Sequence, residues 1–172
     1  MIVDKILLIV MVICFITDVL KQKIYNIIVF PSLISAFIIN TYIYGLPGLK
    51  LSLLGFTAGF AILIVPYLLG GIGAGDVKLL ALVGALKGSI FVVNTAFYMA
   101  FIGGIIALII MALNKHTLIF LKKFFSWLSS LLVGVKYKLE IQDAGLSKKF
   151  PYGTAIVIGS LICLFFKEAW II

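Results

Sequence analysis

The stretch GGIGAGDVKLLALVGALKG, from Gly70 to Gly88, places four glycines directly before an aspartate, Asp76, in the middle of a strongly apolar chain. It fits a phosphate-binding loop, a hinge where helices cross closely, or half of a catalytic carboxylate pair. A phosphate loop follows a β-strand and leaves its backbone N–H groups open for an anion. Here an apolar segment precedes the glycines, and Asp76 already supplies a carboxylate at the start of the next helix. Nucleotide binding is therefore disfavoured, while the hinge and the carboxylate pair stay open.

Composition indicates a membrane protein. Of the 172 residues, 64% are hydrophobic and 12% are charged, with a mean hydropathy of +1.30. Only about half of an ordinary globular composition is apolar, and apolar runs of about 20 residues are typical of membrane spans. We expect an all-α, polytopic membrane helix bundle. About six transmembrane helices are expected, at residues 2–20, 27–44, 51–69, 76–86, 89–113 and 154–172, with a turn at Pro47 and Gly48 after the second. Gly55 and Gly59 in the third helix are spaced for close contact with another helix.

The region 114–151 has a different pattern. Apolar residues recur at helical spacing while a lysine and several serines gather on another side, which is typical of an amphipathic helix at the membrane interface. We expect such a helix on the cytoplasmic side, with a seventh span as the alternative. The whole chain, 1–172, is then one membrane-embedded domain with this region as an insertion.

Lysine alone supplies the positive charge behind the net charge of +8, and the lysines lie between apolar segments. This distribution favours retention of loops in the cytoplasm over binding of nucleic acid. Six spans with both termini outside place ten lysines inside and four outside, Lys87 among them, and Asp4 is likewise expected at the outer boundary. The expected location is the plasma or inner membrane. Cys14 and Cys163 lie in apolar segments without metal-ligand spacing, so neither a metal nor another cofactor is expected.

This topology brings Asp18, near the end of the first segment, and Asp76, at the start of the fourth, to the cytoplasmic side. Two aspartates that share a water molecule can hydrolyse an amide, one as base and one as acid, because like charges held close favour a shared proton. The helix from Asp76 to Gly88 is about 20 Å long, shorter than the hydrocarbon core of about 30 Å. Asp76 is therefore expected below the interface, where an ionisable residue is a functional candidate.

Three sequence motifs in order carry a resemblance to a known family. The stretch GAGDVKLLALVGALKG resembles the G-x-G-D motif of the type IV prepilin peptidases, which are intramembrane aspartic proteases. TDVLKQKIYN, residues 17–26, resembles their first motif, with Tyr25 in place of the usual proline. FPYGTAIVIG, residues 150–159, resembles a third motif, with Thr154 in place of a common proline.

The resemblance implies an endopeptidase that removes the basic leader from prepilins or pseudopilins at the cytoplasmic membrane face. Its substrates would be membrane proteins with a positive leader and an apolar helix. The motifs carry the catalytic role over to Asp18 and Asp76. The chain looks like a short form without the N-terminal zinc and methylation domain of larger relatives.

Five further residues around the motifs are candidates for supporting roles. The glycines beside Asp76 would let an extended substrate backbone approach the acid, since they have no Cβ. The lysines could shape the field around the aspartates or serve only as topology anchors, and the asparagine could instead cap a helix. These residues are Gly73, Gly75, Lys78, Asn26 and Lys23.

Two functions from other classes remain as alternatives. An ion-conducting protein could use the two aspartates as a proton relay, which would give flux without cleavage. A catalytically inactive protein of the same fold would tolerate the loss of both aspartates.

Overall fold

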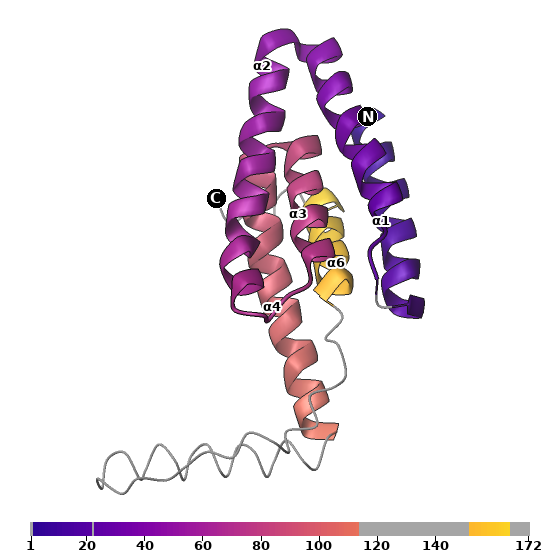
Figure 1. Cartoon of the computed structure of the whole chain (residues 1–172), viewed down its shortest axis with the longest axis vertical. Helices are drawn as coiled ribbons and strands as arrows, with labels where there is room; N and C mark the ends of the chain where they lie inside the picture. The colour runs from indigo at the N-terminus through magenta and orange to yellow at the C-terminus, as the bar shows by residue number, and fades with distance from the viewer. Residues whose placement is uncertain (1, 22, 114–151, 166–172) are drawn as a thin grey trace, which may run out of the picture. The chain divides into compact units, whose positions relative to one another are not determined.

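The computed structural model describes residues 2–21, 23–113 and 152–165, and every element in these ranges is an α-helix, as expected (Figure 1). The chain divides into two units, 1–103 with 151–172, and 104–150. The account below concerns the first unit, and the described part of the second is the end of α4. The helices are α1 (Ile2–Lys21), α2 (Asn26–Leu68), α3 (Ala74–Lys87), α4 (Ser89–Leu113) and α6 (Tyr152–Phe165).

Within the described ranges, two helices are long and apolar enough to cross a membrane. They are α2 and the part of α4 from Ser89 to Ile109. Many large apolar side chains of α1 and α2 are exposed, as expected for surfaces that face lipid. Six separate spans stay a prediction, and the expected helix at 114–151 lies outside the described residues.

The helix α2 is broken at Gly45, where φ is 64° and ψ is −145°. A positive φ favours glycine because any other residue would bring its Cβ against the backbone. The chain turns over at this point (Figure 1). Two helical arms separated by a turn are thus confirmed, although the turn was expected two residues later, at Pro47 and Gly48. Pro47 fits the start of the second arm, since proline is tolerated in a first helical turn.

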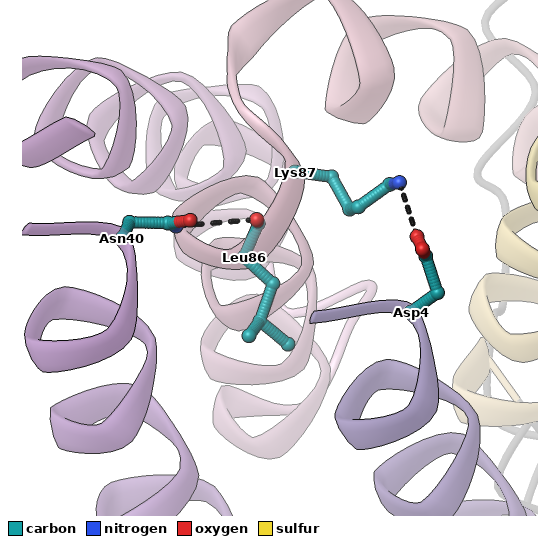
Figure 2. Close-up of polar contacts among 4 residues, drawn as sticks. All are labelled: Asp4, Asn40, Leu86 and Lys87. Atoms are coloured by element: carbon teal, nitrogen blue, oxygen red, sulfur yellow. Dashed lines mark hydrogen bonds and ion pairs between the residues drawn. The ribbon is translucent and has the colours of Figure 1, made fainter. Parts of the chain in front are cut away.

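A buried asparagine, Asn40, connects the two arms of α2 with the end of α3 through hydrogen bonds. Asn40 is 1% exposed, and its Nδ2 lies 2.8 Å from Ser52 Oγ in the second arm. The same nitrogen lies 3.0 Å from the carbonyl oxygen of Ala85 and 3.2 Å from that of Leu86 (Figure 2). The last carbonyls of a helix lack partners within it. Asn40 therefore satisfies the end of α3 and joins it to both arms of α2.

Close contact between α2 and α3 depends on glycine. A Cβ on Gly55 would overlap the carbonyl group of Gly84, and a Cβ on Gly84 would overlap that of Gly55. One turn further along α2, a Cβ on Gly59 would lie 2.5 Å from the carbonyl oxygen of Leu80. The spacing of Gly55 and Gly59 predicted such a contact, and it is confirmed. Every residue of α3 from Leu79 to Leu86 is buried.

An ion pair links the start of α1 to the end of α3. Lys87 Nζ lies 2.6 Å from Asp4 Oδ1 (Figure 2). The sequence predicted both residues at the same outer boundary, and the ion pair places them at a common end. The opposite ends of these two helices carry Asp18 and Asp76.

Replacement of Gly55 by alanine should destabilise the protein, because the new methyl group meets backbone that cannot move aside cheaply. Overpacking of this kind costs about 1–3 kcal/mol, and we expect a lower melting temperature in detergent. Gly104→Ala in α4 is the matched control, since a Cβ there meets nothing within 4 Å. Equal melting temperatures for the two variants would contradict the close contact.

Candidate active site

The carboxyl group of Asp18 is buried and held by a second helix. Asp18 lies in the last turn of α1 and is 6% exposed. Its Oδ2 accepts hydrogen bonds from the backbone N–H of Thr154 at 2.7 Å and from the Thr154 hydroxyl at 2.8 Å. A buried carboxyl group without partners is costly, so these two donors offset much of the cost of burying Asp18.

The start of α6 is built to receive this carboxyl group. The first N–H groups of a helix have no partner within it, and Thr154 lies in the first turn of α6. A Cβ on the preceding residue, Gly153, would lie 2.8 Å from both Cγ and Oδ2 of Asp18. Glycine at this position therefore lets α6 approach the carboxyl group closely enough for both hydrogen bonds.

Asp76 is held by its own helix. It occupies the third position of α3, and its Oδ2 accepts a hydrogen bond of 3.2 Å from the N–H of Gly73, the residue that caps the helix. This contact is half of a capping box. A carboxylate in the first turn is also favoured by the helix dipole. The local sequence thus fixes Asp76 at the start of α3.

The glycines beside Asp76 have partners within the chain. A Cβ on Gly75 would lie 3.0 Å from the Cβ of Ile24, so the segment between α1 and α2 packs against the start of α3. A Cβ on Gly73 would lie 3.1 Å from Asp76 Oδ2. These close contacts explain why glycine occupies both positions. That a substrate backbone approaches Asp76 past these glycines stays a prediction.

The fold brings the two aspartates to one end of the first unit. Asp18 and Asp76 come from different helices, and they lie close enough for the charge of Asp18 to act on Asp76. Two carboxyl groups held close can share a proton, as a base and an acid acting on one water molecule would, and this role for Asp18 and Asp76 stays a prediction. In the described ranges, no group of three or more His, Cys, Asp or Glu residues could hold a metal ion.

Two of the expected supporting residues contact each other. Lys78 Nζ donates a hydrogen bond of 3.1 Å to Asn26 Oδ1 and lies 5.2 Å from the centre of the Phe30 ring. The alternative role of Asn26 as a helix cap is wrong. Tyr25 is the capping residue of α2, and it makes no side-chain cap bond. The start of α2 is instead joined to α3 through Lys78, two residues after Asp76.

In the part of the chain that the structure describes, no lysine forms a salt bridge with Asp18 or Asp76. The salt bridge resolved there joins Lys87 to Asp4, at the other end of α3. Lys23 is exposed in the segment between α1 and α2. A role for Lys23 or Lys78 in shaping the field around the aspartates stays a prediction.

Sequence reasoning did not identify Thr154 as part of the site. The signal was present in the third motif, where a residue with two donors stands at a position that commonly holds proline. Its partner, Asp18, is 136 residues away in the chain, and no local pattern connects the two.

Comparison with known proteins gives one match. A family model described as the type IV leader peptidase family matches residues 5–108. This is more than half of the chain and includes both aspartates, but not Thr154. No curated protein and no solved structure is significantly similar to the chain.

The contact between Asn26 and Lys78 should be measurable as a coupling. We expect the melting temperatures of Asn26→Ala, Lys78→Met and the double variant to be non-additive, equivalent to a coupling of about 0.5–1.5 kcal/mol for a single hydrogen bond. Lys23→Met combined with Asn26→Ala is the control pair and should be additive. Additive shifts for Lys78 would show that the hydrogen bond contributes nothing.

Proposed function

Because the chain belongs to the type IV leader peptidase family, we propose that it is an intramembrane aspartic endopeptidase that removes the basic leader from prepilin-like or pseudopilin precursors. The observation that supports this most is that Asp18, buried in the last turn of α1, and Asp76, in the first turn of α3, lie at the same end of these two helices, opposite the ion pair between Asp4 and Lys87. Asp18 and Asp76 both lie within the matched region, and each is fixed by hydrogen bonds to backbone N–H groups.

The proposed reaction is hydrolysis of one peptide bond. The ionised aspartate takes a proton from a water molecule as the water oxygen bonds to the carbonyl carbon. The protonated aspartate hydrogen-bonds the carbonyl oxygen and stabilises the charge that develops on it. The proton then passes to the amide nitrogen, and the carbon–nitrogen bond breaks. One carboxylic acid and one amine result, and the dyad again holds a single proton.

We propose that the substrate approaches along the loop before α3. Gly70 has a φ of 77°, and a Cβ there would meet nothing within 4 Å among the described residues, which leave this part of the loop open. The neighbouring side chains of Leu68 and Leu69 are 74% and 81% exposed. An apolar segment that precedes Asp76 in the chain suits a substrate whose cleavage site precedes an apolar helix. An extended backbone could pass Gly70 without meeting a side chain.

We also propose that the protein crosses the plasma or inner membrane several times, with the aspartate end toward the cytoplasm. The length of α3, 14 residues, corresponds to about 21 Å. This is less than the hydrocarbon thickness of about 30 Å, so Asp76 would lie below the interface in a hydrated recess. The ion pair between Asp4 and Lys87 would then lie at the outer side.

Replacement of either aspartate should abolish cleavage. We expect Asp18→Ala and Asp76→Ala to lose processing of a co-expressed precursor with a lysine-rich leader, a glycine before the cleavage site and an apolar helix. A gel shift of the precursor measures cleavage. Asp4→Asn is the matched control, because it neutralises an acidic residue at the other end of α3 and should leave cleavage intact.

The amount of each variant in the membrane has to be measured in the same cells. Cleavage that persists in either alanine variant would overturn the two-aspartate mechanism. Loss of cleavage in Asp4→Asn as well would mean that any lost carboxylate disrupts the fold, and it would remove the support for a specific pair.

The proposed orientation can be tested by labelling single cysteines. In intact cells, Lys50→Cys should react with a membrane-impermeant maleimide, while Lys23→Cys should react only after permeabilisation. Cys14 and Cys163 are both buried, so the wild-type chain is the background control. Labelling of Lys23→Cys in intact cells would place the aspartate end outside and contradict the proposal.

A further inference from the structure

We infer that Thr154 is a positioning residue that orients the carboxyl group of Asp18 for the reaction. This inference rests on the proposed function. Its basis is the pair of hydrogen bonds, 2.7 and 2.8 Å, that Thr154 donates from its N–H and its hydroxyl to a single oxygen, Oδ2 of Asp18.

Two donors on one oxygen fix the rotation of the carboxyl group. A single hydrogen bond would let the group turn about its last torsion, which is broad for aspartate. With both donors on Oδ2, the other oxygen, Oδ1, has a defined direction. The described part of the chain supplies no hydrogen bond to Oδ1, so this oxygen is the one left for water or for Asp76.

The surroundings of Thr154 keep this arrangement rigid. The threonine lies in the first turn of α6, and Gly153 allows the closest possible approach to Asp18. One turn and more further along, a Cβ on Gly159 would lie 2.9 Å from the carbonyl oxygen of Thr95, so α6 is also packed tightly against α4. Groups held by packed helices are placed more accurately than groups on loops.

Thr154 supplies two donors that proline could not supply at this position. A proline, common at this position in the motif that the sequence resembles, has no N–H and no hydroxyl. It could not donate either hydrogen bond to Asp18. The orientation of Asp18 in this protein therefore depends on a contact that a chain with proline lacks.

The test compares Thr154→Val with Thr154→Ser in purified protein, with kcat and KM measured on the same lysine-rich precursor. Valine keeps the shape and the backbone N–H but loses the hydroxyl. We expect kcat to fall about tenfold, as for the loss of one hydrogen bond that supports the transition state, with KM unchanged. Serine keeps both donors and should stay within about threefold of wild type.

Thr57→Val is the matched control, because the Thr57 hydroxyl contacts only backbone carbonyls of its own helix, those of Leu53 and Leu54. It should retain full activity. If Thr154→Val fails to fold, as judged by its melting temperature, Thr154→Ala takes its place in the comparison with serine. Wild-type kcat in the valine or alanine variant would overturn the inference, and so would an equal loss in the serine variant.

Failure of the role of Thr154 can be distinguished from failure of the proposed peptidase function. Asp18→Ala, run in the same assay, must be inactive if the protein is an aspartic peptidase. An inactive Asp18→Ala beside a fully active Thr154→Val would refute the role of Thr154 alone. Activity in Asp18→Ala would refute the peptidase mechanism and the inference together.

Discussion

The contact of Gly55 with Gly84 is the constraint on which the other features of the first unit depend. With no side chain on either residue, the backbones of α2 and α3 meet directly, and α3 becomes the buried centre of the unit. Its two ends are then placed by the same contact. At one end, Asn40 satisfies the last carbonyls of α3. At the other end, Asp76 lies in the first turn of this closely packed helix. A packed helix such as α3 holds the carboxyl group of Asp76 more accurately than a loop would.

Much of this could be predicted from residues alone. The apolar composition and run lengths predicted an all-helical chain, and the spacing of Gly55 and Gly59 predicted the close helix contact. The motifs singled out Asp18 and Asp76 as candidates, and the structure places both at the same end of the first unit; their catalytic role stays a prediction. The turn within α2 was expected at Pro47 and Gly48, but it occurs at Gly45, because the positive φ needed for the break requires glycine. Pro47 indicated a turn in the sequence, but the backbone break itself lies at Gly45.

The rest depends on contacts between distant parts of the chain. The hydrogen bonds from Thr154 to Asp18 join α6 to α1, and neither segment carries a periodic pattern that would reveal them. Asn26 was a plausible helix cap by its position, yet its side chain binds Lys78 of α3. The glycines before Asp76 suggested room for a substrate, whereas Gly75 is packed against Ile24. In each case residue type indicated that a position mattered, and only the tertiary arrangement showed its partner.

The distance along the chain between Asp18 and Thr154 has a consequence for biosynthesis. Asp18 leaves the ribosome among the first residues, and its partner follows 136 residues later. At about 5–20 residues per second, the nascent chain holds Asp18 without these donors for on the order of ten seconds. The segment that matches the family, residues 5–108, is already complete by then. A chain interrupted between these points would carry both aspartates without a fixed Asp18, so the site is assembled only when the last described helix has been made.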